Sequence, residues 1–538
     1  MFDQALRFFA VIWFGGILAG VCISGCDGSG SSSSGQEPET PAAPLDLLVY
    51  EQDISSRLYK LDSLGRSTLL SEGMLKSDYA ISPDGRYIAF ADSLADGQAA
   101  ITILSPTENN PEQAGSDYPP EAYLSIQWQP DSQGVVYSVY DASEFVSYLY
   151  LSTLGETEPV ELIGSNLGAL ARLQVEQSYD GSRLAVLVEY YSAESDSLPE
   201  SAALYLLELL NPETMSLIGT AEGDANSFKF AWSPYGNDLV YQRRLRTDPV
   251  APSIPDNYPA GALMLMDASG TSRLIREAQG DTDWTYLAWL DPTRLLIRTT
   301  DLEVINIAGN LLTSHTITGN SEMEISPDHR RLAFLDKSAT DGHPAVYMLE
   351  LESGEYRELG PASSDFLIGG AFEDSKVRWS PHGSYLAWNV KPSPFGPDWQ
   401  TMVGGLYVYD VGSTTTQLVS ENLALHDQHY LSDGFFAWLP EGRSLDYVVR
   451  REAGYELAVV DIASGDTRAV GELPSVNCGV QRVWRDQAQI LWNACDDGVY
   501  LSSSKQSGSF TTSRVADWDV WRMVTTADRE FVIMQAVD

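Results

Sequence analysis

Basic residues are scarce in this chain of 538 residues, where 33 Lys and Arg stand against 75 Asp and Glu and give a formal net charge of −42. Such a surface repels phosphate backbones, so we expect no nucleic-acid partner. A basic partner, bound cations, or plain solvation in a salty habitat would each account for the excess of acid. The composition therefore narrows the classes of partner without selecting one.

A long amphipathic helical period is also missing, so we expect very little helix. Beyond the N-terminal segment the sequence lacks a Gly-x-Ser-x-Gly motif followed by Asp and His, and the residues after the last β unit leave no room for an α/β-hydrolase domain. We therefore do not expect a serine peptidase. The composition instead includes 43% hydrophobic residues, with 13 Trp and 27 Tyr, which suits strands packed sheet on sheet.

Cysteine is rare, with four residues in the whole chain. Cys22 and Cys26 lie in the N-terminal segment, which leaves Cys478 and Cys495. The midpoint of this second pair coincides with a predicted β-turn, so the two lie opposite each other across a predicted hairpin. In an extracytoplasmic compartment this favours a Cys478–Cys495 disulfide, and two buried thiols are the alternative.

The N-terminus, residues 1–25, is similar to the signal peptide of a bacterial lipoprotein. An apolar run from Phe8 to Val21 is followed by Ile23-Ser24-Gly25-Cys26, and small residues before a Cys resemble a lipobox. The resemblance implies that Cys26 is lipidated and becomes the first mature residue. The run is short for a spanning helix, and a plain membrane anchor is the alternative.

The next segment, residues 26–44, is rich in Gly and Ser and then in Pro, as expected for a flexible tether. With a lipid on Cys26, it predicts a protein anchored in the bacterial cell envelope, on the periplasmic or outer-surface side. Asp27 resembles a retention signal for the inner membrane of enteric bacteria, a rule that does not extend to all bacteria.

One pattern recurs through residues 45–538: Ile81-Ser82-Pro83-Asp84-Gly85 followed by a β-prone run to Phe90. Pro83 suits the first central position of a type I turn, Asp84 can bond its own backbone, and Gly85 accepts a positive φ. The pattern predicts a strand, a tight turn and a second strand. Ten copies occur 36 to 59 residues apart, at Ile81, Trp128, Gln177, Trp232, Trp289, Ile325, Trp379, Trp438, Trp484 and Thr525.

A β unit with this period predicts an all-β fold, a β-propeller with four-stranded blades. Partial units at Leu45–Leu70 and Trp518–Asp538 complement each other, so we expect the N- and C-terminal strands to close one ring of about ten units. Two smaller propellers are the alternative.

The turn and its flanking strands resemble the TolB-type propeller repeat, which is WD-like and rich in Pro-Asp. The Pro is present in copies one, two, four, six, seven and eight, shifted by one in copy five, and absent from the others. The resemblance implies the fold over nearly all of residues 45–538. Members of the family bind proteins, peptides or sugars, or form the propeller part of serine peptidases, so function has to be argued separately.

Propeller topology separates the connections between two faces. Loops from first to second and from third to fourth strands form one face, which we call the short-turn face because it carries the repeated turns. Second-to-third loops and blade-to-blade connections form the other, the long-connection face, and we expect it to bind the ligand near the central channel. We assign six segments to it: Ser105–Ala122, Tyr191–Ser201, Thr247–Ala260, Pro361–Ser375, Lys391–Gly404 and Glu421–Gly434.

Three residues in these segments are candidates for contact with a partner. Trp399 lies in a Pro-rich segment and does not follow the repeat. His426 and His429, with Asp433 nearby, could reach one ion, but no third ligand has a firm spacing, so we expect solvated loop residues and no metal site. The Trp residues that do follow the repeat are instead expected to pack between blades.

No cofactor is predicted, although the acidic pairs Asp281/Asp283, Asp496/Asp497 and Asp517/Asp519 leave Ca²⁺ open. None of these pairs has a full binding-loop pattern. We expect a lipid-anchored module that binds a protein or peptide, or acts as a scaffold. The alternative is a propeller-type enzyme acting on glycan or peptide at the channel mouth.

Overall fold

The computed structural model describes residues 47–537 apart from the following segments: 53–55, 62–66, 94–97, 106–110, 120–121, 142–145, 157, 165–170, 192–200, 210–214, 223–229, 244–261, 278–285, 299–300, 318–322, 338–343, 363–376, 391–402, 425–435, 453, 474–481, 485–487, 495–497, 506–508, 517–518 and 526–531. The predicted signal peptide and tether lie outside the described residues.

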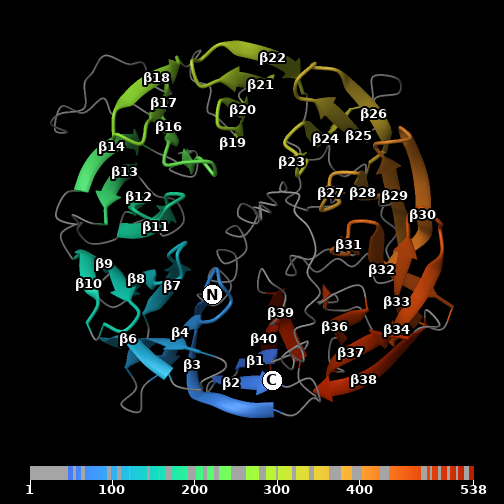
Figure 1. Cartoon of the computed structure of the whole chain (residues 1–538), viewed down its shortest axis with the longest axis horizontal. Helices are drawn as coiled ribbons and strands as arrows, with labels where there is room; N and C mark the ends of the chain where they lie inside the picture. The colour runs from blue at the N-terminus through green and yellow to red at the C-terminus, as the bar shows by residue number, and fades with distance from the viewer. Residues whose placement is uncertain are drawn as a thin grey trace, which may run out of the picture.

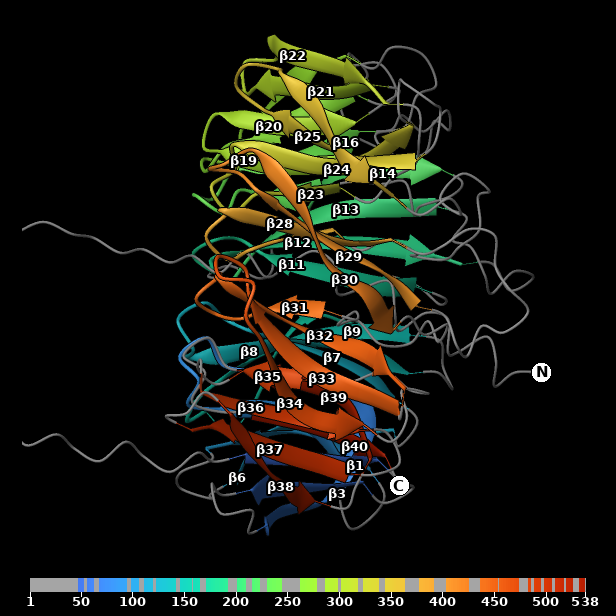
Figure 2. The ribbon, with the colours of Figure 1, turned by 90° about the vertical axis from the view of Figure 1, so that its right-hand side faces the viewer.

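The described residues contain forty strands and no helix, and these strands form one ring around a central opening (Figure 1). The strands group into eight sheets, which make a seven-bladed propeller and one curled sheet. Within each four-stranded blade the strands follow one another in chain order from the ring axis outward. Figure 2 shows the ring from the side, with the short turns along its left edge.

Six of the blades have four strands each. The first two are β7 (Tyr123–Trp128), β8 (Gly134–Asp141), β9 (Val146–Thr153) and β10 (Val160–Ile163), then β11 (Ala171–Gln177), β12 (Arg183–Tyr190), β13 (Ser201–Glu208) and β14 (Met215–Glu222). The next two are β15 (Phe230–Trp232), β16 (Leu239–Arg243), β17 (Ala262–Met266) and β18 (Ser272–Arg276), then β19 (Tyr286–Asp291), β20 (Arg294–Arg298), β21 (Asp301–Asn306) and β22 (Leu311–Thr316). The last two are β23 (Met323–Ile325), β24 (Arg331–Lys337), β25 (Pro344–Glu350) and β26 (Tyr356–Pro361), then β35 (Arg482–Trp484), β36 (Gln489–Ala494), β37 (Gly498–Ser504) and β38 (Phe510–Ala516).

The seventh blade has eight strands because two repeats share one sheet. Its strands are β27 (Val377–Trp379), β28 (Tyr385–Val390), β29 (Val403–Asp410), β30 (Thr415–Ala424), β31 (Phe436–Trp438), β32 (Ser444–Arg451), β33 (Gly454–Asp461) and β34 (Thr467–Leu473). The two halves meet where Leu423 pairs with Val449.

The curled sheet holds both ends of the described chain. Its order is β39 (Asp519–Thr525), β40 (Val532–Val537), β1 (Leu47–Gln52), β2 (Ser56–Leu61), β3 (Ser67–Ile81), β4 (Ile88–Ser93), β5 (Ala99–Leu104) and β6 (Pro111–Tyr118). β1 and β40 pair in parallel from Leu47↔Val532 to Gln52↔Val537, so strands from the two ends lie side by side as predicted.

The predicted propeller of four-stranded blades is confirmed, but the grouping of its units differs. The sequence predicts about ten units, whereas hydrogen bonding gives seven blades and a curled sheet. The difference arises because the curled sheet and the eight-stranded blade each join two neighbouring units into one continuous sheet.

Alternate residues of a strand pack against opposite neighbouring blades, as the two-residue period of a strand requires. In β16, Leu239 and Tyr241 pack against the β11–β14 blade, whereas Val240 packs against the β19–β22 blade. The middle strands are therefore buried on both sides, and β17 is buried along its whole length. The outer strands are more exposed, as in β22.

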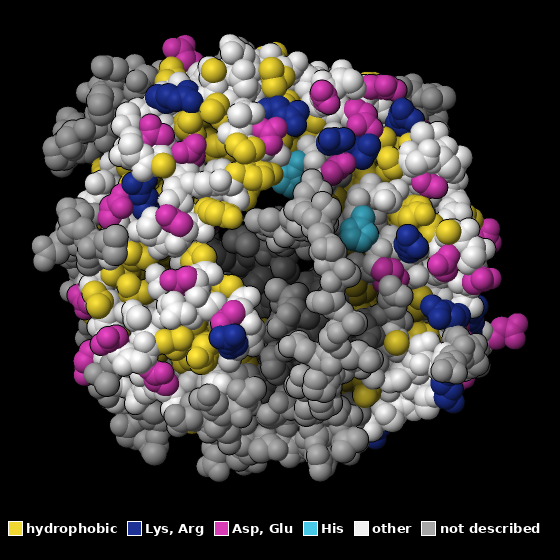
Figure 3. Space-filling model, viewed as in Figure 1, with side chains coloured by type: hydrophobic (Ala, Val, Ile, Leu, Met, Phe, Trp, Pro, Cys, Tyr) yellow, Lys and Arg dark blue, Asp and Glu magenta, His cyan; other side chains and the backbone are white. Residues whose placement is uncertain are grey.

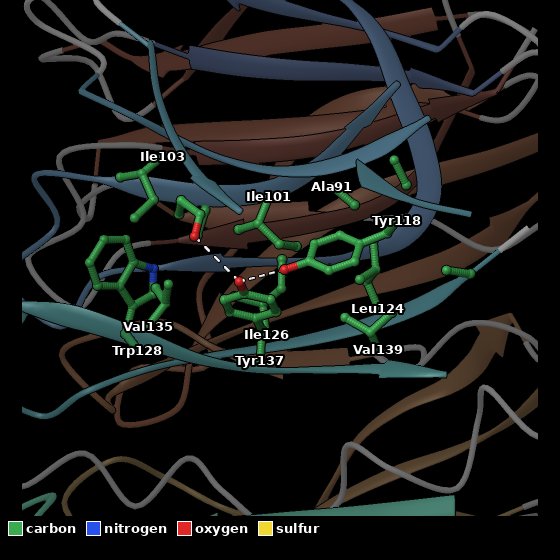
Figure 4. Close-up of a cluster of buried hydrophobic side chains, with 14 residues drawn as sticks. Ala91, Ile101, Ile103, Tyr118, Leu124, Ile126, Trp128, Val135, Tyr137 and Val139 are labelled. Atoms are coloured by element: carbon green, nitrogen blue, oxygen red, sulfur yellow. Dashed lines mark hydrogen bonds between the residues drawn. The ribbon is translucent and has the colours of Figure 1, made fainter. Parts of the chain in front are cut away.

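Tyrosines fill the core between the curled sheet and the β7–β10 blade (Figure 4). The hydroxyls of Tyr118 and Tyr137 lie 2.8 Å apart, and the Tyr137 hydroxyl also donates to the carbonyl of Ala114 at 3.3 Å. A Cβ at Gly115 would overlap the Tyr137 hydroxyl, so the close approach needs glycine there. Paired hydroxyls keep these rings satisfied inside an otherwise apolar core.

A buried ion pair joins the eight-stranded blade to the β35–β38 blade. Asp446, in the middle of β32, accepts hydrogen bonds from Nε of Arg482 and, at 2.5 Å, from Nε1 of Trp484. The side chains of Arg482 and Asp446 are only 1% and 0% exposed. The charges therefore depend on each other for stabilisation that water would otherwise provide.

Candidate binding site on the innermost strands

The repeated turns form the short-turn face, which surrounds a hollow at the ring centre in Figure 3. In the first turn the N–H of Gly85 donates to the Ser82 carbonyl at 2.8 Å, Gly85 has φ of 72°, and Ser82 Oγ donates to Asp84 at 2.7 Å. The N–H of Arg86 also donates to Asp84 at 3.1 Å, so the predicted roles of Asp84 and Gly85 are confirmed.

Neighbouring turns are tied to one another across the blades. The N–H of Asp84 donates to Ser132 Oγ at 3.1 Å, and the side-chain amide of Asn237 donates to Asp180 at 2.6 Å. Burial disfavours the charge on Asp180, but hydrogen bonds from Ser182, Asn237 and Ser178 outweigh it and lower the pKa of Asp180 to about 2. These polar groups are thus used to hold the ring together.

Two turns carry a side chain at a left-handed φ where four equivalent turns carry glycine, at Gly85, Gly181, Gly383 and Gly442. The two side chains are those of Ser132, with φ of 60°, and His329, with φ of 55°. Nδ1 of His329 lies 2.7 Å from the hydroxyl of Tyr235, and both groups reach the carbonyl of Leu290, at 2.7 and 3.1 Å. Each strained residue therefore contributes a bond to another turn, which offsets its backbone cost.

The Trp that ends an innermost strand joins its blade to the preceding one. The indole N–H of Trp128 donates to the Ala80 carbonyl at 2.9 Å, and that of Trp379 to the Glu324 carbonyl at 3.0 Å. The same bond recurs at Trp232 and Trp289, and at Trp438 it joins the two repeats of the eight-stranded blade. Trp484 instead donates to Asp446. The prediction that these residues pack between blades is confirmed.

Five of the six segments assigned to the long-connection face connect strands as predicted. Three lie between second and third strands (β12–β13, β16–β17 and β28–β29), one lies between blades (β26–β27), and one lies between the two repeats of the eight-stranded blade (β30–β31). The prediction is wrong for Ser105–Ala122, which contains β6. This outer strand was missed because an edge strand needs only its backbone bonds to β5, so a polar sequence is compatible with it.

The innermost strand β11 carries a polar stripe, consisting of Arg172, Gln174 and Glu176. Antiparallel pairing places Glu176 beside Ala185 and Gln174 beside Leu187, both of which pack against β16. The stripe therefore lies on the side of the β11–β14 blade that faces the β15–β18 blade. Its Arg172 end lies at the long-connection face, and its Glu176 end lies two residues before Ser178, where the short turn of this blade begins.

At the outer end of the stripe, Arg172 lies over two aromatic rings. Its guanidinium carbon is 4.7 Å from the ring centre of Tyr191 and 5.8 Å from that of Tyr140. The Tyr191 hydroxyl donates to Glu189 at 3.1 Å. Burial and the Glu189 carboxylate raise the pKa of Tyr191 to about 12, so this hydroxyl keeps its proton at neutral pH. The cluster combines a cation with flat aromatic surface, as contact sites often do.

At the end of the stripe nearer the short-turn face, Glu176 is a half-buried carboxyl group. Burial raises the pKa of Glu176 to about 7, and a hydrogen bond with Gln174 opposes the shift. Among the residues that the structure describes, no Lys, Arg or His forms an ion pair with it. Near neutral pH, the Glu176 side chain can therefore be either an ionised carboxylate or a protonated carboxylic acid.

The residues that the sequence singled out for function lie outside the described ranges. These are Cys26, Cys478, Cys495, Trp399, His426 and His429. The ladder of β35 and β36 lies between the two flanking cysteines in sequence, and their disulfide stays a prediction. The acidic pairs considered for Ca²⁺ have at least one member outside the description.

Within the described ranges, no group of three or more His, Cys, Asp or Glu is arranged to hold a metal ion. The part of the chain that the structure describes also contains no helix with the length and hydropathy needed to cross a membrane.

Sequence reasoning did not identify the β11 stripe, although a signal for it exists. Ala171-Arg-Leu-Gln-Val-Glu-Gln177 alternates apolar and polar residues at the strand period. Other innermost strands, such as Phe-Ala-Trp in β15 and β31, have no such polar alternation. The innermost strand β7 has a similar alternation, but its Gln127 donates to the Val175 carbonyl of the next blade at 2.7 Å.

No family model matches this sequence, and no curated protein matches it. Solved structures similar to this chain include a prolyl endopeptidase, with 14% identity over 66% of this chain and a TM-score of 0.35. A eukaryotic initiation factor has 11% identity, covering 80% of this chain and 97% of that chain, with a TM-score of 0.48. TolB from Acinetobacter baumannii has 12% identity over 80% of each chain, with a TM-score of 0.23. This chain spans about half, 51%, of the length of the prolyl endopeptidase. The propeller fold itself is established by the strand order.

Proposed function

We propose that this chain is a lipid-anchored, extracytoplasmic β-propeller that binds a protein or peptide through its long-connection face. In this proposal its ten sequence repeats are TolB-type units of one ring, two pairs of which share a sheet. The lipid is attached at Cys26, and the Gly/Ser/Pro tether of residues 26–44 holds the ring in the cell envelope.

The observation that carries the proposal is the difference between the two faces. On the short-turn face, polar groups of the described turns bond to neighbouring turns, as between Asp180 and Asn237. On the long-connection face, the Arg172 cluster presents a cation and aromatic rings, and five long segments join the strands there. A rigid ring with variable connections on one face is a common design for a binding module.

A crosslinking pull-down of the anchored protein tests this proposal. We expect partner capture to fall when the Lys391–Gly404 segment is shortened, and to be unaffected by Tyr179→Ala, which removes a side chain that is 47% exposed on the short-turn face. An unchanged set of partners after shortening would count against the long-connection face. Capture lost with Tyr179→Ala alone would place the partner on the opposite face.

The same preparation tests the anchor. We expect the wild-type chain to incorporate a labelled fatty acid and to fractionate with membranes, whereas Cys26→Ser should be unlabelled. Labelling that persists in this variant would exclude Cys26 as the lipid attachment site.

A propeller-type enzyme is the second candidate, and Glu176 is the observation that favours it. A carboxyl group with a pKa of about 7 in the ring wall is suited to donating or accepting a proton near neutral pH. Hydrolysis of a glycan or peptide library by the wild type, and its loss in Glu176→Gln, would support this function over binding alone.

A further inference from the structure

We infer that the Glu176 carboxylate is the binding site for a guanidinium or ammonium group on a side chain of the partner. This inference rests on the proposed function, because it names the chemistry that the partner brings. The evidence for it is a comparison of Glu176 with Glu324, two glutamates that occupy the same position in different repeats.

The first place is Glu324 in β23, whose charge is matched within the chain. One carboxylate oxygen of Glu324 accepts the backbone N–H of Trp379 at 3.2 Å. The other oxygen lies 3.6 Å from Nη1 of Arg378, which is in the innermost strand of the next blade. A cation from the following repeat thus compensates this carboxylate.

The second place is Glu176 in β11, which has the same backbone setting. Glu176 pairs with Ala185, as Glu324 pairs with Ala333. The indole of the following blade donates to its carbonyl at 3.1 Å, from Trp232, as Trp379 does to Glu324 at 3.0 Å. The position of Arg378 is occupied by Ala231, so the compensating cation is replaced by a methyl group.

The groups packed on this side of the blade do not replace that cation. Arg172 lies four residues away along β11, over Tyr140 and Tyr191, and Arg183 of β12 pairs with Glu208 at 2.8 Å. On β15 and β16, the side chains on this side of the blade are Phe230, Trp232, Leu239 and Tyr241. On β11 and β12, the neighbours are the uncharged Gln174 and the titratable Arg172 and Glu189.

The ligand is a cation for two independent reasons. The ring itself places a guanidinium against Glu324, so the local geometry is compatible with that group. The chain as a whole carries a formal charge of −42, which attracts a basic segment and repels an acidic one. Burial that raises the pKa of Glu176 also means that binding a cation should restore its ionised form.

Titration of the full chain with an end-blocked tetra-arginine peptide tests the inference, with end-blocked tetra-norleucine as the uncharged probe. At pH 8 we expect the wild type to bind tetra-arginine at least about tenfold more tightly than Glu176→Gln does. Below pH 7 the wild-type affinity should fall by up to about tenfold per pH unit as the carboxylate takes up a proton, while Glu176→Gln should show no such step.

Matched variants separate this site from general attraction to an acidic surface. Glu156→Gln removes the same charge at an exposed position and should bind as the wild type does. Ala231→Arg supplies within the chain the cation that Arg378 supplies elsewhere, and should abolish the pH-dependent part of binding. A carbon-13 NMR titration of the Glu176 carboxyl group should show its pKa falling in Ala231→Arg and in the peptide complex.

The inference is overturned if Glu176→Gln and the wild type bind tetra-arginine with the same affinity and pH profile, or if tetra-norleucine binds equally well. It is also overturned if Glu176→Gln captures the crosslinked partner as fully as the wild type does. In that last case, loss of capture on shortening Lys391–Gly404 would leave the proposed function standing, so the two failures are distinguishable.

Discussion

Replacing Arg482 with Met should destabilise the propeller far more than a typical surface substitution does. Asp446 and Arg482 are nearly inaccessible to water, so the substitution leaves a buried carboxylate whose remaining described side-chain donor is the neutral indole of Trp484. Removing one partner of a buried ion pair costs about 3–5 kcal/mol, whereas Met is similar enough in length to leave only a small cavity.

The chain offers a matched control in Arg451→Met. Arg451 donates to Glu456 at 2.6 Å, but its side chain is 50% exposed, and such pairs contribute about 0–1 kcal/mol. A double variant, Asp446→Asn with Arg482→Met, removes the stranded charge and should recover much of the loss. The three variants thus separate the cost of an unpaired charge from the loss of one arginine.

Urea denaturation followed by tryptophan fluorescence measures these differences, with the slope of the transition checked for constancy. The reasoning is refuted if Arg482→Met shifts the midpoint no further than Arg451→Met does. It is also refuted if the double variant is less stable than the single one, because the loss would then come from packing.

Two further predictions concern the short-turn face. Ser132→Ala should be about 1 kcal/mol less stable than Ser132→Gly in the same urea assay. Both variants lose the hydrogen bond from the Asp84 N–H, but glycine adopts a φ of 60° without strain. Equal stabilities of the two variants would contradict this prediction. Because the pKa of Asp180 is lowered to about 2 in the folded chain, its contribution to stability is present above pH 4 and lost as the pH falls toward 2. The thermal midpoint of Asp180→Ala should therefore depend less on pH across that window, and parallel curves would contradict the assignment.

The repeated turn could be predicted from the sequence because its chemistry is local. Pro83, Asp84 and Gly85 each act on backbone within a few residues, so the same residue types produce the same turn wherever they recur. The alternation of apolar residues then specifies a strand on each side. Fold class, blade type and the packing role of the repeated tryptophans all follow from such short-range patterns.

The grouping of strands into sheets and the position of β6 depend on contacts that no local pattern encodes. A single pair, Leu423↔Val449, joins two repeats into one blade, and neither residue is unusual for a strand. β6 has a polar sequence because its outer edge faces solvent, so its composition resembles that of a loop. Exposed edges are where sequence patterns carry the least information about strand pairing.

The candidate site depends on a relation between repeats. Glu176 and Glu324 occupy equivalent positions, and what distinguishes them is the residue one repeat later, Ala231 in one case and Arg378 in the other. Arg378 and Arg482, both on innermost strands, each pair with a carboxylate of the preceding blade. A carboxylate whose cation is missing from the next blade is therefore where an external cation gains most, and aligning the repeats in neighbouring pairs would have revealed it.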